Sequence, residues 1–100
     1  MPAAERIPAL EAAEAIAAQG LAFLADDPAR LSRFLAATGL TPDQIREQVA
    51  APGFLAAVLE YLATDESLLL AFAANVAIGP ESVASALTVL ERACHTDSRP

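Results

Sequence analysis

The chain contains a single cysteine, Cys94, and a single histidine, His95, among its 100 residues. One cysteine cannot close a disulfide bond within the chain, and zinc sites use three or four protein ligands. Neighbouring residues of a helix also point in different directions. We therefore interpret Cys94 as a thiol at the edge of the core and His95 as a solvated imidazole, and we expect neither a metal nor another cofactor.

Basic residues are scarce. The chain has six arginines, no lysine and thirteen acidic residues, for a net charge of −7. From Glu47 to Glu91 there are six acids and no base at all. Proteins bind the phosphates of nucleic acids through clustered lysine and arginine side chains. The charge distribution therefore disfavours a nucleic acid as partner.

Long apolar segments are missing too. The longest charge-free segment is Ser67 to Pro80, fourteen residues, whereas a transmembrane helix needs about 20 apolar residues. The first residues include Glu5 and Arg6 and lack the basic start and apolar block of a secretory signal. Together with the unpaired cysteine, these features predict a cytoplasmic protein with no membrane segment.

The usual sequence signals of catalysis are absent as well. The chain has no glycine-rich phosphate loop, no serine–histidine–acid set and no cluster of metal ligands. A single histidine close to the end of the chain also disfavours acid–base catalysis at neutral pH. We therefore predict that the protein is not an enzyme.

The sequence does contain an internal repeat. The segment from Leu21 to Ile45 returns 38 residues later as Leu59 to Val83, with eight of twenty-five positions identical. Self-similarity at a fixed spacing is typical of a duplicated supersecondary unit. The identical pairs are Leu21/Leu59, Leu24/Leu62, Ala25/Ala63, Asp27/Asp65, Leu31/Leu69, Phe34/Phe72, Ala36/Ala74 and Pro42/Pro80.

Helical spacing of apolar residues runs through both copies, and no useful segment alternates at period two. Start and stop signals such as Asp27-Pro28, Pro52-Gly53 and Gly79-Pro80 divide the pattern into about six helices, the first beginning near Pro8. The sequence therefore predicts an all-α fold, a single compact bundle and one domain over residues 1–100. Its two similar three-helix halves are expected at 8–50 and 52–94, followed by a frayed tail at 95–100.

Three positions carry specific packing predictions. Phe34 and Phe72 are expected in the core. Gly20 interrupts a helical stripe at a cost of about 1 kcal/mol relative to alanine, which indicates close approach of another helix. The helix that follows Asp65 has no polar face. Because a helix that is apolar all round is normally buried all round, we expect it to be central.

Three blocks carry a resemblance to a known family. They are D-P-A-R-L-S-R-F-L-A-A-T-G-L-T-P-D-Q-I-R, A-P-G-F-L-A-A-V-L-E-Y-L and D-E-S-L-L-L-A-F-A-A-N. The chain resembles the domain-of-unknown-function 3572 family over about Leu10 to Leu90. The resemblance implies an uncharacterised cytoplasmic helical protein with no assigned catalytic residues. The family pattern has glycine where Ala77 stands, so either Asn75 takes over the left-handed turn, which asparagine tolerates, or the helix ends differently here.

The polar residues that could form a functional site also have ordinary structural explanations. The acid pairs Asp26/Asp27 and Asp65/Glu66 could hold a metal, but each pair stands where a helix begins, so we interpret them as caps. Asn75 is the polar residue that we expect to be buried. Its predicted role is to bond the backbone at a helix end, and the alternative is a polar anchor for a ligand or partner.

The segment from Leu31 to Gln48 has the outline of a DNA-reading helix-turn-helix, with Gly39 in the turn and a capping box from Thr41 to Gln44. The reading helix would present two acids, Asp43 and Glu47, and a single base. Acids facing phosphates are unfavourable, so this is the alternative interpretation only.

The leading hypothesis is a small protein–protein interaction or self-association module. The hypothesis rests on the number of apolar residues, which exceeds what a small core needs. The surplus is expected at the surface, where exposed apolar patches often mark contact sites. The candidate partner-binding residues are Phe54, Tyr61 and Val89, which stand at the edges of apolar stripes. The partner is expected to be another protein or a second copy, in the simplest case an isologous dimer.

Overall fold

Six helices make up the part of the chain that the computed structural model describes, which is residues 2–49 and 51–97, with side chains for 10–49 and 51–93. No strand occurs within those residues, which confirms the all-α prediction. The division into two three-helix halves stays a prediction. The helices are α1 (Pro2–Ala25), α2 (Pro28–Thr38), α3 (Pro42–Gln48), α4 (Pro52–Ala63), α5 (Glu66–Asn75) and α6 (Pro80–Asp97).

The helix starts follow from side-chain caps. Asp27 accepts a hydrogen bond from the Ala29 N–H (2.9 Å), and Asp65 accepts one from the Leu68 N–H (3.2 Å). Thr41 and Gln44 form the reciprocal capping box expected from their spacing. The predicted capping role of Asp27 and Asp65 is therefore confirmed.

Two helix ends differ from the prediction. Helix α1 begins at Pro2 rather than near Pro8, and proline is a residue type that is favoured at the first helical position. Helix α6 continues to Asp97, beyond the predicted end at residue 94. The last three residues of the predicted frayed tail lie outside the described part of the chain.

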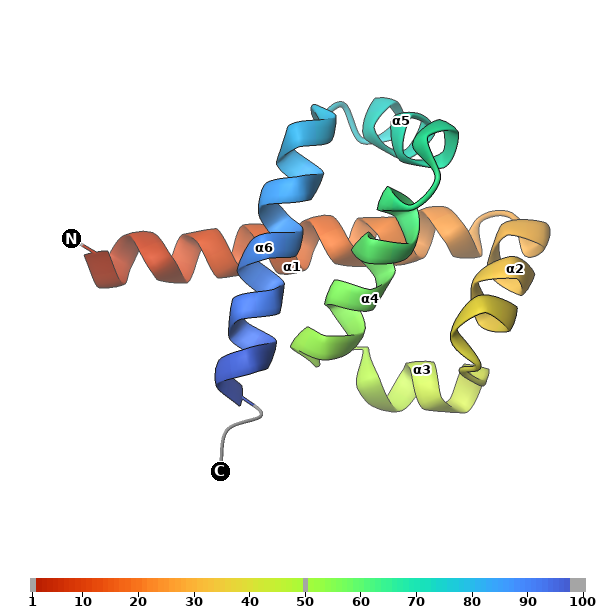
Figure 1. The fold of residues 1–100 in the computed structure, drawn as a ribbon, viewed down its shortest axis with the longest axis horizontal. Coiled ribbons are helices and arrows are strands. Elements are labelled where there is room, and N and C mark those ends of the chain that lie inside the picture. Colours follow the sequence, from red (N-terminus) through yellow and green to blue (C-terminus); the bar gives the residue numbers. More distant parts are fainter. Residues whose placement is uncertain (1, 50, 98–100) are drawn as a thin grey trace.

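Helix α1 runs along most of the length of the molecule, and α4 and α6 both lie across it (Figure 1). Helices α2 and α3 lead from the end of α1 to the start of α4, and α5 joins α4 to α6. The molecule is flattened, with extents of 43 × 33 × 18 Å. The core therefore lies where α1, α4 and α6 meet.

The central helix is α4, and the prediction that the helix after Asp65 would be central is wrong. Helix α4 contributes more buried side chains than any other element in the described part of the chain: Phe54, Leu55, Ala56, Val58, Leu59 and Leu62. In α5 only Phe72 and Ala73 are buried, while Leu70 is 48% exposed. The reason is position: α4 packs against both α1 and α6, whereas α5 contacts α4 and α6 from the edge.

Two phenylalanines anchor the peripheral helices to this core. Phe34 of α2 and Phe72 of α5 are both fully buried, as predicted. The Phe34 ring lies 5.2 Å from that of Tyr61, and the Phe72 ring lies 5.6 Å from that of Phe23. Phe23 and Tyr61 are themselves equivalent positions of the repeat. Each copy's phenylalanine thus packs on the other copy's aromatic residue.

Gly20 of α1 lies directly against α4. A Cβ atom at this position would stand 2.9 Å from Leu62 Cδ1 and 3.3 Å from Val58 Cγ1. These distances are shorter than ordinary van der Waals contact. The close helix approach predicted from Gly20 is confirmed.

Helix α5 ends with Ala77 in the left-handed region, at φ 58°. The Ile78 N–H bonds to the Ala73 carbonyl (2.9 Å) and the Ala77 N–H to the Ala74 carbonyl (3.3 Å). This is the Schellman arrangement, in which glycine usually takes the left-handed position. Gly39, one repeat earlier, has φ 75°. Asn75 therefore does not take over the left-handed turn, because Ala77 adopts it directly.

Within the described residues, no single helix has both the length and the hydropathy needed to cross a membrane. In the same part of the chain, one pair of helices, α5 and the Pro80–Ala93 part of α6, reaches that length and composition together, and the two are bent by 99°.

Candidate functional site

Of the three residues predicted to bind a partner, one is buried and two are half-buried. Phe54 is only 4% exposed, and its ring packs edge-on against Phe34 at 6.4 Å. The expectation that Phe54 lies at the surface is therefore wrong, because it faces the core side of α4. Tyr61 is half-buried against the same Phe34 ring, and Val89 is half-buried on α6. The structure does not bring these residues together into one surface.

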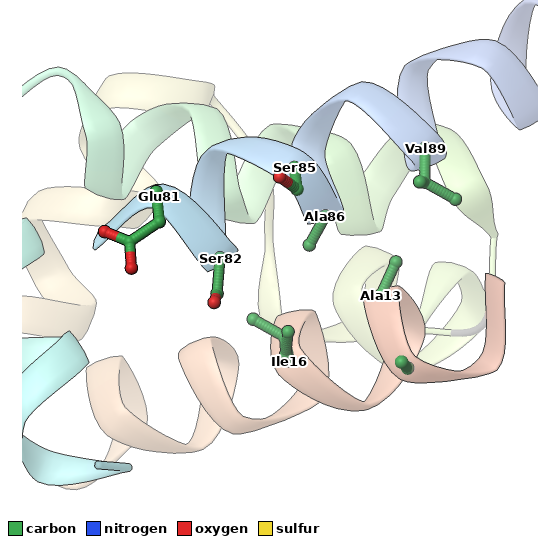
Figure 2. Close-up of a pocket in the computed structure, with 8 residues that line it drawn as sticks. Ala13, Ile16, Glu81, Ser82, Ser85, Ala86 and Val89 are labelled. Carbon is green, nitrogen blue, oxygen red and sulfur yellow. The ribbon is translucent and has the colours of Figure 1, made fainter. Parts of the chain in front are cut away.

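Val89 lines a shallow groove between α1 and α6 (Figure 2). The groove has a volume of about 250 Å³ and is open to solvent. Ala13 and Ile16 form its α1 side, and small side chains of α6, among them Ser82 and Ser85, form the other. Among the described side chains, Glu81 at one end is the only charged one that lines it. The polar groups of the groove are the carboxylate of Glu81 and the hydroxyls of Ser82 and Ser85, and small or apolar side chains form the rest of its lining.

A more distinctive surface lies on α5. Ser67, Leu70, Ala71 and Ala74 are all exposed, and their spacing places them on one side of the helix. We call these four residues the outer face of α5. The face has no formal charge, and Leu70 and Val49 are the large hydrophobic residues classed as exposed among the described side chains.

The repeat shows that this face is not a requirement of the fold. The equivalent positions on α2, also all exposed, are Ala29, Ser32, Arg33 and Ala36. The exposed Ser32 and Arg33 of α2 correspond to the exposed Leu70 and Ala71 of α5. Periodicity alone did not identify Leu70 as a surface residue, because it placed the whole helix in the core. Leu70 is equivalent to Ser32 in the repeat, and this polar equivalent is the signal that could have identified Leu70 as a surface residue.

A second hollow, of about 440 Å³, is lined by residues from the ends of α1 and α5 and from the first turn of α2. Its polar lining comes from Gln19, Asp26, Arg30 and Asn75, and Phe23 contributes an apolar wall. The Arg30 guanidinium lies 4.1 Å from the centre of the Phe23 ring, and Nη1 donates to the Phe23 carbonyl at 3.2 Å. Arg30 Nε also lies 3.8 Å from a carboxylate oxygen of Asp27. Arg30 was not singled out from the sequence as a site residue.

The prediction that Asn75 is buried is wrong. Asn75 is the last residue of α5 and is exposed, and no polar side chain is buried among those that the structure describes. Its side chain borders the second hollow. The reason is that α5 is peripheral, so its final turn faces solvent.

The remaining sequence candidates are the Cys94–His95 pair, the acid pairs and the helix-turn-helix segment. The side chains of Cys94 and His95 lie outside the described part of the chain. Elsewhere in the described residues, no three histidine, cysteine or acidic side chains are grouped as a metal site would need. On α3, Arg46 pairs with Asp43 on the surface.

The comparisons with known proteins place the chain in a family without adding an activity. No curated protein and no solved structure matches the chain. Residues 10–93 match the family described as "Protein of unknown function (DUF3572)", in agreement with the resemblance of its three sequence blocks. Because this match covers most of the sequence, the chain belongs to the DUF3572 family.

Proposed function

We propose that this protein is a non-catalytic protein–protein interaction module that binds through the outer face of α5. The observation that carries the proposal is Leu70, which is 48% exposed in a helix without a polar stripe, at a position where the repeat has serine. Helix α5 is already anchored by Phe72 on its inner side. Its outer side therefore does not need leucine for the helix to dock on the core.

A bound partner that covers Leu70 would add a favourable hydrophobic free energy that the monomer does not gain at this position. Complete burial of a leucine side chain is favourable by about 1.5–3 kcal/mol. Ala71 and Ala74 flank Leu70 with small side chains, which allow another helix to approach closely. The face suits a helix that presents apolar residues at i, i+3 and i+4.

The simplest occupant is the same face of a second copy. A net charge of −7 makes most surfaces of two copies repel one another. The outer face of α5 lies in the longest charge-free segment of the chain, so repulsion is weakest there. An isologous pairing would place two uncharged α5 helices against each other.

Sedimentation velocity over protein concentrations from about 10 μM to about 1 mM tests this proposal. We expect a concentration-dependent dimer for the natural chain and a monomer for Leu70→Ser, which installs the residue of the equivalent α2 position. Ser32→Ala is the matched control and should dimerise like the natural chain. A monomer at every concentration for the natural chain would exclude self-association and leave only a different protein as partner.

DNA binding is the alternative, and the arrangement on α3 argues against it. The base of that helix, Arg46, pairs with Asp43, and Glu47 is exposed beside it. A reading helix with this charge would repel phosphates. A mobility-shift assay on mixed-sequence DNA at low salt should show no retardation, and retardation would favour the helix-turn-helix interpretation instead.

A further inference from the structure

We propose that the second hollow, between the ends of α1 and α5 and the start of α2, binds a small zwitterion of the α-amino acid class. Its ammonium group would face Asp26 and its carboxylate would face Arg30. The hollow is open to solvent and has a volume of about 440 Å³, which is within the range of about 300–1,000 Å³ typical of small-molecule sites. The proposal is independent of the outer face of α5.

Arg30 is held in place before any ligand arrives. Its guanidinium lies over Phe23, 4.1 Å from the ring centre, and Nη1 is fixed by the Phe23 carbonyl at 3.2 Å. A guanidinium has five N–H donors in a rigid fork, so donors remain for a carboxylate. Because the side chain is already ordered, binding costs little of its conformational entropy.

The fold itself does not require arginine at this position. The equivalent residue in the second copy is Leu68, which is half-buried and packs against the core. An apolar side chain therefore suffices to dock the helix after an aspartate cap. At Arg30 the chain instead places a positive charge beside a hollow.

Asp26 supplies the opposite charge. It is exposed and lines the same hollow, yet the ion pair that Arg30 makes is with Asp27, at 3.8 Å. Among the described residues no ion pair involves Asp26. A simple anion would be repelled by Asp26 and a simple cation by Arg30, whereas a zwitterion satisfies both. The amides of Gln19 and Asn75 can donate and accept at the rim.

Titration of the ¹⁵N-labelled full chain with individual protein amino acids tests the proposal by NMR. We expect saturable shifts of the Arg30 Nε–H and of the Gln19 and Asn75 side-chain amides. Arg30→Leu, which copies Leu68, should weaken binding by about tenfold or more while the dispersed spectrum is kept. Arg33→Ala, on the same helix and outside the hollow, should bind like the natural chain.

Asp26→Asn separates a zwitterion site from a general anion site. It should weaken binding of the amino acid and leave or improve binding of propionate, which has no ammonium group. Absence of any shift at Gln19 and Asn75 with all amino acids up to about 10 mM would overturn the proposal. Equal binding by Arg30→Leu, or tighter binding of propionate than of alanine by the natural chain, would overturn it as well.

Discussion

Single aromatic residues carry a large share of the packing in this small core. Phe34 and Phe72 are fully buried, and each touches an aromatic ring from the other copy of the repeat. Aromatic pairs of this kind add about 0.5–1.5 kcal/mol to the free energy of area burial. The two residues therefore attach α2 and α5 to the rest of the molecule.

Replacement of either phenylalanine by alanine should strongly destabilise the protein. We expect Phe34→Ala and Phe72→Ala each to lower the free energy of unfolding by about 3–5 kcal/mol, because each leaves a cavity in the core. Leu70→Ala, on the outer face of α5, is the control and should change it by less than about 1 kcal/mol at monomer concentrations. Urea unfolding measures all three, and a loss below about 1 kcal/mol for either phenylalanine would contradict its core role.

Ala77 stores backbone strain that glycine would relieve. A left-handed conformation costs a non-glycine residue about 1–2 kcal/mol, while the greater freedom of glycine in the unfolded chain offsets about 0.4–1 kcal/mol of any gain. We expect Ala77→Gly to raise the free energy of unfolding by about 0.5–1 kcal/mol.

The reverse change at the equivalent position is the control for Ala77. Gly39 has φ 75°, and a Cβ atom added there would meet no other atom within 4 Å, so Gly39→Ala should cost about 1 kcal/mol through the backbone alone. Stabilisation by both substitutions, or by neither, in denaturant unfolding would contradict the assignment of strain to Ala77.

At the scale of helices, the sequence predicted the helix starts and caps, which depend on local signals. The starts at Pro28, Pro42 and Pro80 and the caps Asp27 and Asp65 follow from residue types whose preferences act within one turn. The depth of each helix in the bundle depends instead on contacts between distant segments. The periodicity of apolar residues alone could not show that α4 is buried more deeply than α5, because both helices are apolar.

The candidate surfaces were predictable only in part for the same reason. Val89 does line a groove and Tyr61 is partly accessible, but Phe54 faces Phe34 in the core. Leu70 and Arg30 were missed because periodicity treats each helix by itself. The repeat equivalent of Leu70 is Ser32, and that of Arg30 is Leu68. Comparison with these equivalents identifies Leu70 and Arg30 as residue types that the fold does not need at these positions.

The contact between α1 and α4 should tolerate no added volume at Gly20. We expect Gly20→Val to lower the free energy of unfolding by about 1–3 kcal/mol, because the new side chain would collide with Leu62 and Val58. Ala18→Val, on the exposed side of α1, introduces the same β-branched side chain without the collision and should cost less than about 1 kcal/mol, through helix propensity alone. Thermal or urea unfolding that shows equal losses for both would contradict close packing at Gly20.

At the scale of the whole molecule, charge governs association. Two copies that each carry −7 repel at low ionic strength, and salt shortens the Debye length from about 30 Å at 0.01 M to about 8 Å at 0.15 M. Self-association through the uncharged outer face of α5 should therefore strengthen as salt is added. Sedimentation at both salt concentrations measures this, and an association that weakens with salt would indicate contact between opposite charges instead.

Cross-linking from the outer face of α5 tests the proposed dimer most directly. Ala74 and Ala36 are equivalent positions of the repeat, both exposed, so Ala74→Cys and Ala36→Cys form a matched pair in a Cys94→Ser background. With a short bis-maleimide, we predict efficient covalent dimer formation for Ala74→Cys that is lost when Leu70→Ser is added, and little for Ala36→Cys. Equal yields from the two positions, or a yield at Ala74→Cys that Leu70→Ser does not change, would contradict the account.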